Sequence, residues 1–171
     1  MKFPLHIPFV EALGFELHAF EGGHAELRVD LDQAHLNSWE VAHGGVLMTM
    51  LDVAMAHAAR SVHIAAANYG PGIATIEMKT SFVRAAEGRL RATGHLLHKT
   101  QTLAFCEGSV FNHAGELCAH STGTFKYLRA LPAGSRRPEA LQMAAPAVAV
   151  PAGVPAAATG EPAIATTREP S

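Results

Sequence analysis

The stretch GGVLMTMLDVAMAHAAR, residues 44–60, most constrains the fold because it predicts a helix with almost no polar side. Apolar residues recur at helical spacing on one face, and the opposite face is hardly more polar. The two sets are Val46, Leu47, Met50, Leu51, Ala54 and Ala58, and then Met48, Thr49, Val53, Met55 and Ala56. A helix that is apolar nearly all round is buried on most sides. We therefore expect a sheet wrapped round this helix, with the remaining face covered by a second subunit.

Alternation of polar and apolar residues predicts β-strands on both sides of the helix in the sequence. Residues 15–19 and 25–31 alternate around a Glu21-Gly22-Gly23 turn and predict a hairpin. After a loop around residues 68–72, short loops rich in turn formers separate four further segments, which favours antiparallel pairing. These segments are 73–83, 89–98, 103–111 and 117–127. Two strands, one long helix and four strands indicate an α+β fold, with an antiparallel sheet wrapped around one central helix.

The composition of the chain changes abruptly after Leu131. Residues 132–171 contain seven of the ten prolines, many alanines and no aromatic residue. Such a segment buries too little apolar surface to offset the entropy lost on ordering. We therefore expect one folded domain over residues 1–131 and a disordered Ala/Pro-rich tail over residues 132–171.

Charge and composition exclude several classes of partner. The formal net charge is −2 without a long basic run, which argues against nucleic acid. No apolar stretch reaches the length of a membrane span, and Pro4 and Pro8 interrupt the apolar N-terminus, unlike a signal peptide. Cys106 and Cys118 form no CxxC motif and indicate free thiols in a reducing compartment. We expect a soluble, cytoplasmic protein that binds neither nucleic acid nor membrane.

Three polar elements stand out around the start of the helix. Asn37 is followed six residues later by His43-Gly44-Gly45, and Asp52 lies nine residues after His43. This set and its spacing resemble the hotdog-fold acyl-CoA thioesterases of the phenylacetate-pathway (PaaI-like) type. The segment TLAFCEGSVFNHAGELCAHSTGTFKYL also looks like that family's last two strands. The resemblance implies a hotdog fold and hydrolysis of an acyl-CoA by water, with no separate cofactor because CoA is part of the substrate.

Elementary chemistry gives these residues roles in such a reaction. Gly44 and Gly45 stand at a helix N-terminus, where backbone N–H groups lack intrahelical partners and the helix dipole favours negative charge. A thioester carbonyl bound there is stabilised as its oxygen becomes an oxyanion. Asn37 offers an amide that positions water or substrate, and Asp52 is the only strong base candidate in the helix. His43 either orients the loop by hydrogen bonding or carries a proton.

The spacing of the glycines and the acid predicts a shared site. Gly44 and Asp52 are separated by ~12 Å along the axis at ~1.5 Å per residue. General-base catalysis needs contacts of about 3 Å, so Asp52 cannot easily serve the glycines of its own helix. It could serve an antiparallel helix across a two-fold axis. We therefore expect a homodimer with two composite sites, which the resemblance also implies, and assembly as a dimer of dimers.

Five further residues are candidates for the site or its surroundings. The family carries a hydroxyl residue at the position of Thr75 that helps to orient water or the acid, although a threonine also suits a plain strand. In the turn before the fifth strand the family often carries a Gly and a basic residue near the nucleotide phosphates. Thr100 and Gln101 stand there in this chain, so phosphate contact is expected from the flanking Lys99 or Thr102. Trp39 forms either a wall of the substrate pocket or a dimer contact. Glu40 stands where the family often has Gly: either it carries a strain of about 1 kcal/mol at positive φ, or the loop differs and Glu40 contacts substrate.

Other chemistries find little support in the sequence. Among eleven histidines, His95 and His98 are expected on opposite faces of a strand, and no HExxH or zinc-spaced Cys/His set occurs, so we expect no metal. No GxSxG marks a serine nucleophile. The alternatives to a thioesterase are a hotdog-fold dehydratase or hydratase, and a non-catalytic acyl-CoA-binding module. The Met and Ala residues around the site fit an aryl, a medium-chain or a branched acyl group.

Overall fold

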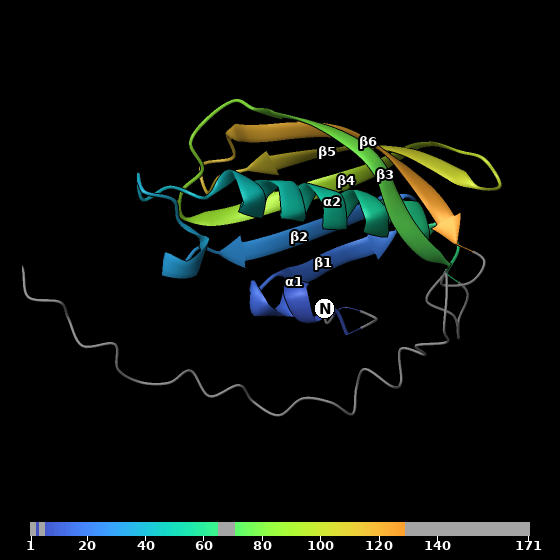
Figure 1. Ribbon diagram of the computed structural model, residues 1–171, viewed down its shortest axis with the longest axis horizontal. Coiled ribbons are helices and arrows are strands. Elements are labelled where there is room, and N and C mark those ends of the chain that lie inside the picture. The colour runs from blue at the N-terminus through green and yellow to red at the C-terminus, as the bar shows by residue number, and fades with distance from the viewer. Residues whose placement is uncertain (1–2, 4–5, 65–70, 129–171) are drawn as a thin grey trace, which may run out of the picture.

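The computed structural model describes residues 3, 6–64 and 71–128, and it confirms the predicted α+β architecture (Figure 1). The tail at 132–171 and most of the loop expected around 68–72 lie outside the described residues. The elements in chain order are α1 (Pro8–Ala12), β1 (Glu16–Glu21), β2 (His24–Asp30), η1 (Gln33–His35, a 3₁₀ turn), α2 (Gly44–Ser61), β3 (Gly72–Phe82), β4 (Arg89–Lys99), β5 (Leu103–Phe111) and β6 (Leu117–Leu128).

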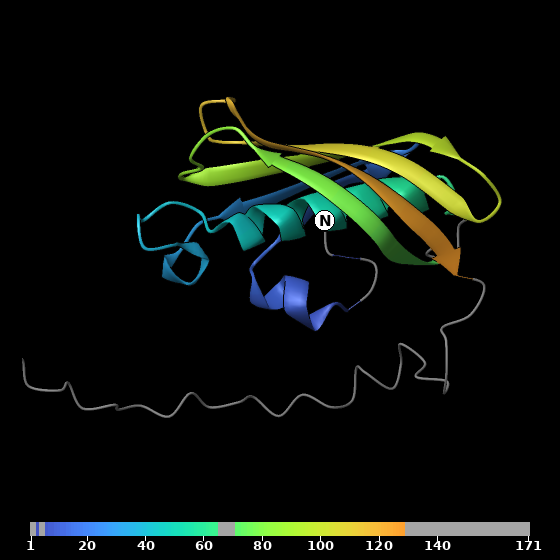
Figure 2. The ribbon, with the colours of Figure 1, turned by 45° about the horizontal axis from the view of Figure 1, so that its top comes forward.

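The six strands form one antiparallel sheet in the order β1-β2-β4-β5-β6-β3. The chain leaves α2 and crosses to the far edge of the sheet, where it forms β3. The last three strands, β4, β5 and β6, then fill the space between β2 and β3. The sheet curves around α2, which contacts all six strands (Figures 1 and 2). The short helix α1 lies on the same face of the sheet as α2 (Figure 2).

Helix α2 packs very close to the middle of the sheet. A Cβ atom on Gly94 of β4 would overlap the backbone carbonyl of Ala54, so only glycine permits this approach. The core-facing side chains of α2, among them Met50, Leu51 and Met55, have no exposed surface. One stripe remains at least partly exposed and follows the helical repeat: Gly45, Met48, Thr49, Asp52 and Ala56. The helix is therefore apolar nearly all round, yet the described chain leaves the face that carries Asp52 incompletely covered.

Two details of the structure differ from the sequence prediction. The short elements α1 and η1 were not expected, because a single turn has no measurable periodicity. The prediction that His95 and His98 point to opposite faces is wrong. The β4–β5 register shifts at Leu97, so His95 lies opposite Glu107 and His98 opposite Phe105. This bulge places both histidines on the same face of the sheet.

Candidate active site

The N-terminus of α2 presents one free donor and not two. His43 caps the helix, and its Nδ1 accepts a hydrogen bond from the Gly45 N–H at 2.9 Å. The Val46 N–H donates to the His43 carbonyl oxygen at 2.9 Å. Within the part of the chain that the structure describes, the Gly44 N–H donates no hydrogen bond. Gly44 therefore offers its N–H to a ligand, whereas the Gly45 N–H is engaged by the cap of the helix.

Asn37 builds the loop that precedes this helix. Its Oδ1 accepts hydrogen bonds from the Trp39 N–H at 2.9 Å and the Val41 N–H at 3.4 Å. Its backbone N–H donates to the Val41 carbonyl at 2.9 Å, while its carbonyl accepts from the Glu40 N–H at 3.0 Å. Glu40 closes this tight loop at φ 60°. The first alternative for Glu40 therefore holds, because the position requires the left-handed conformation that favours glycine.

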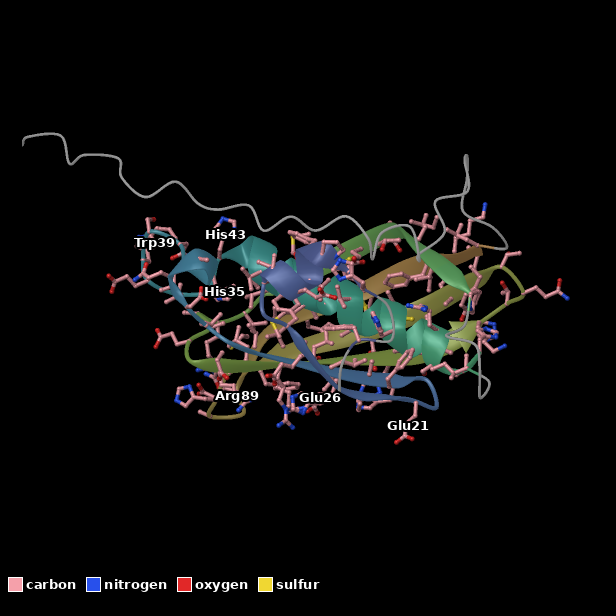
Figure 3. All side chains as sticks on the ribbon, turned by 90° about the horizontal axis from the view of Figure 1, so that it is seen from below. Glu21, Glu26, His35, Trp39, His43 and Arg89 are labelled. Carbon is pink, nitrogen blue, oxygen red and sulfur yellow. The ribbon has the colours of Figure 1, made fainter. Side chains whose placement is uncertain are left out.

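The tip of this loop is open to solvent. The side chain of Trp39 is 82% exposed, and it lies at the same end of the molecule as His35 and His43 (Figure 3). An indole of this exposure is a surface that a ligand or a second subunit would cover. Both roles predicted for Trp39, a wall of the substrate pocket and a dimer contact, require such an exposed side chain.

Asp52 and Thr75 are brought together from α2 and β3. The Thr75 hydroxyl donates a hydrogen bond to Asp52 Oδ1 at 2.6 Å, a short distance typical of a charged acceptor. Burial raises the pKa of Asp52 above its ordinary value, and the hydrogen bond from Thr75 partly offsets that rise. A carboxylate with a raised pKa is a better proton acceptor than an exposed one.

The remaining predicted residues lie at the two ends of α2. Gly44 and Asp52 belong to one continuous helix, so the predicted separation of ~12 Å stands. Lys99 and Thr102 flank the β4–β5 turn, where the Tyr127 N–H donates to the Thr102 carbonyl at 2.9 Å. The Tyr127 hydroxyl in turn donates to Ala59 near the C-terminus of α2. These contacts link the β4–β5 turn to the C-terminal end of α2, whereas Gly44 is the first residue of that helix.

Phe82 is a neighbour of the site that the sequence did not single out. Its ring lies against Gly44, where an added Cβ would meet the ring atoms at 3.4 and 3.5 Å. The strand β3 therefore borders both halves of the site, with Thr75 beside the acid and Phe82 beside the backbone donor. Phe82 is 53% exposed, so it also contributes apolar surface at the rim of the site.

Other reactive groups do not converge on this site. Cys106 and Cys118 are free and buried, as expected for packed thiols. Burial raises the pKa of Cys106 to about 12, which disfavours the nucleophilic thiolate. Among the described residues, no group of three or more His, Cys, Asp or Glu side chains could hold a metal ion. Helices long and apolar enough to cross a membrane are also missing from the described ranges.

Comparison with known proteins identifies the family that this geometry suggests. The sequence profile of the thioesterase superfamily matches residues 40–119, which run from the loop before α2 into β6. Over these residues the chain is similar to the thioesterase superfamily. The match includes Gly44, Asp52 and Thr75, and the resemblance to the PaaI-like hotdog thioesterases is confirmed.

Individual relatives agree with this assignment. The medium/long-chain acyl-CoA thioesterase YigI of Escherichia coli K12 is 27% identical over 135 residues, covering 72% of this chain and 87% of its own. The conserved protein PA5202 of Pseudomonas aeruginosa is 29% identical with a TM-score of 0.66, covering 72% of this chain and 96% of that one. A mutant of the phenylacetic acid degradation protein PaaI from Thermus thermophilus is 25% identical with a TM-score of 0.63. The match covers 71% of this chain and 100% of that one. The hotdog fold is confirmed.

Proposed function

We propose that this protein is an acyl-CoA thioesterase, which hydrolyses a thioester to a carboxylic acid and CoA. The observation that carries the proposal is that one helix supplies both groups that thioester hydrolysis needs. These are a free N–H of Gly44 at a helix N-terminus and a partly buried Asp52 carboxylate with a raised pKa. The similarity to YigI, whose name records medium- and long-chain acyl-CoA thioesters, supports the same substrate class.

In the proposed reaction, the thioester carbonyl oxygen accepts a hydrogen bond from the Gly44 N–H. Asp52 takes a proton from a water molecule, whose oxygen forms a bond to the carbonyl carbon. The Gly44 donor and the helix dipole then stabilise the oxyanion of the tetrahedral intermediate. Collapse of the intermediate breaks the C–S bond, and the proton held by Asp52 passes to the departing CoA sulfur. Asn37 positions the water or the thioester, and Thr75 holds the acid in place.

We further propose that each site is shared between two subunits of a homodimer. The partly exposed stripe of α2 contains Asp52, and β3 is an unpaired edge of the sheet among the described strands. An antiparallel second copy of α2 would bring Asp52 of one subunit to Gly44 of the other. Lys99 and Thr102 flank the β4–β5 turn near the C-terminal end of α2 and are proposed to contact the phosphates of CoA. Two such dimers would form the tetramer, and the free thiols suit a reducing cytoplasm.

The alternative hotdog chemistry of a dehydratase or hydratase would need a histidine paired with the acid. Asp52 instead accepts a hydrogen bond from Thr75, and His43 Nδ1 is engaged by the Gly45 N–H. No histidine hydrogen-bonds to Asp52 within residues 6–64 and 71–128. The geometry therefore favours activation of water over dehydration.

Steady-state hydrolysis by wild-type protein and the Asp52→Asn variant tests this function. The substrates are a panel of acyl-CoA thioesters, and release of the CoA thiol is followed. Because the base acts in the transition state, kcat should fall ~10²-fold or more while KM changes little. Asp30→Asn is the matched control, since Asp30 is an exposed carboxylate at the end of β2. Absence of wild-type hydrolysis on every substrate, or near-normal kcat in a folded Asp52→Asn variant, would refute the proposal.

A further inference from the structure

A pocket of about 360 Å³ opens beside the free backbone donor, on the side of α2 that faces α1. Its walls come from α1, η1 and the first turns of α2. Apolar side chains make up most of the lining, which consists of Phe9, Leu13, Ala34, Leu36, His43, Gly45, Val46 and Thr49. Gly45 and His43 are the two chain neighbours of Gly44. The pocket therefore borders the first turn of α2 on both sides of Gly44 in the sequence.

The walls of this pocket are tied together by His35, which is 3% exposed. Its Nε2 donates to the Leu13 carbonyl at the end of α1 at 2.9 Å. Its backbone carbonyl accepts from the His43 N–H at 2.8 Å, and its Nδ1 lies 3.0 Å from the Asp32 N–H. One buried side chain thus joins α1, η1 and the cap of α2. The pocket is consequently a fixed feature of the fold and not a gap between independent surface segments.

The polar groups on the pocket wall are already engaged within the protein. The Thr49 hydroxyl donates to the Gly45 carbonyl at 2.8 Å, and the Gly45 N–H donates to His43 Nδ1 at 2.9 Å. A ligand that has no polar atoms could therefore occupy the pocket, because these hydrogen bonds would stay intact. Leu13, Leu36 and Val46 provide aliphatic surface in the same place. Such a wall matches an alkyl chain.

We propose that this pocket holds the alkyl tail of the acyl group and sets the chain length that the enzyme prefers. The inference rests on the proposed thioesterase function, because the tail enters from a carbonyl held by Gly44. A straight medium-length chain leads from that carbonyl between α1 and α2, and its far end lies beside Phe9. Each methylene that enters the pocket raises kcat/KM by up to about fourfold, until the pocket is full.

Ala34→Phe tests the proposal because it fills the pocket from an exposed position. The Ala34 N–H donates to Asp32 Oδ1 at 2.8 Å, a backbone contact that the larger side chain retains. Ala114→Phe is the matched control. Ala114 is also an exposed alanine two residues after an Asx side chain, and its N–H donates to Asn112 Oδ1 at 3.0 Å. The measurement is kcat/KM for straight-chain acyl-CoA thioesters from butyryl to myristoyl.

We expect Ala34→Phe to lower kcat/KM at least tenfold for the longer chains and less than twofold for butyryl-CoA, with no change in Ala114→Phe. Phe9→Ala, which removes an exposed part of the wall, should reduce the advantage of long chains without affecting short ones. An unchanged chain-length profile in both Ala34→Phe and Phe9→Ala would overturn the pocket assignment. If the wild-type protein still hydrolyses acyl-CoA, the proposed thioesterase function would be unaffected by that result. A uniform loss across all lengths would overturn the pocket assignment as well. Lack of wild-type hydrolysis at every length would refute the function itself, and with it this inference.

Discussion

Two individually inactive variants should restore each other's activity if every site is shared between subunits. Asp52→Asn removes the acid, and Gly44→Pro removes the backbone donor. The structure favours the proline, because Gly44 is the first residue of α2 and His43 has φ −61° and ψ 137°, a conformation compatible with a following proline. Gly44→Ala is the matched control. It keeps the N–H, and its Cβ would meet the Phe82 ring at 3.4 Å, an ordinary contact.

The expected size of the rescue follows from the geometry. Loss of an oxyanion donor costs ~10²–10³-fold in kcat, and loss of the base costs ~10²-fold or more, so each variant alone should retain about 1% or less. In a mixed dimer with shared sites, one site carries both defects and the other carries neither. Random pairing at equal amounts makes about half of the dimers mixed, so about a quarter of all sites are intact.

The assay compares thiol release by the co-refolded mixture with that of each variant refolded alone. Two tags of different mass on the subunits allow native mass spectrometry to measure the mixed dimers. Activity near a quarter of wild type supports the shared site, whereas Gly44→Ala should be active without a partner. If mixed dimers form and the activity equals the average of the separate variants, Asp52 and Gly44 do not meet across the interface. A monomeric wild-type protein would refute the shared site directly.

Two further substitutions probe the acid and the loop. Thr75→Val removes the hydrogen bond that lowers the pKa of Asp52, so that pKa should rise further. The base then remains protonated to a higher pH, and the acid limb of the kcat/KM profile should shift upward in pH, while Thr75→Ser leaves it in place. Glu40→Gly relieves the left-handed backbone at φ 60° and should stabilise the protein by about 1 kcal/mol. A thermal melt of Glu40→Gly that shows no gain in melting temperature would contradict the inferred backbone strain at this position.

The long helix and most strand boundaries could be predicted because their periodicity extends over many residues. β5 was predicted at its observed bounds, and β6 ends one residue beyond the prediction. The bulge at Leu97 could not be predicted, since one inserted residue changes the face of everything after it without altering the local pattern. His35 also escaped notice, although the spacing of Asp32 and His35 is that of a capping box, a signal that would have marked η1.

The candidate site residues could be selected from the sequence, but their hydrogen bonds could not. Spacing alone placed Gly44 and Asp52 on one helix, and their separation followed from helix geometry. The pairing of Asp52 with Thr75 joins residues 23 positions apart, and only the antiparallel course of β3 along α2 brings them into contact. The engagement of the Gly45 N–H by His43 depends on a side-chain rotamer, which the sequence does not encode in a readable pattern.

Two local costs to stability lie in the same candidate functional region. Glu40 occupies a backbone conformation that glycine would adopt with less strain. Burial raises the pKa of Asp52, so the folded state loses stability as the pH rises from the ordinary pKa of an aspartate through this raised pKa. A core selected for stability alone would replace both residues. Their positions in the loop before α2 and on its incompletely covered stripe are explained by a site that binds an acyl thioester and activates water.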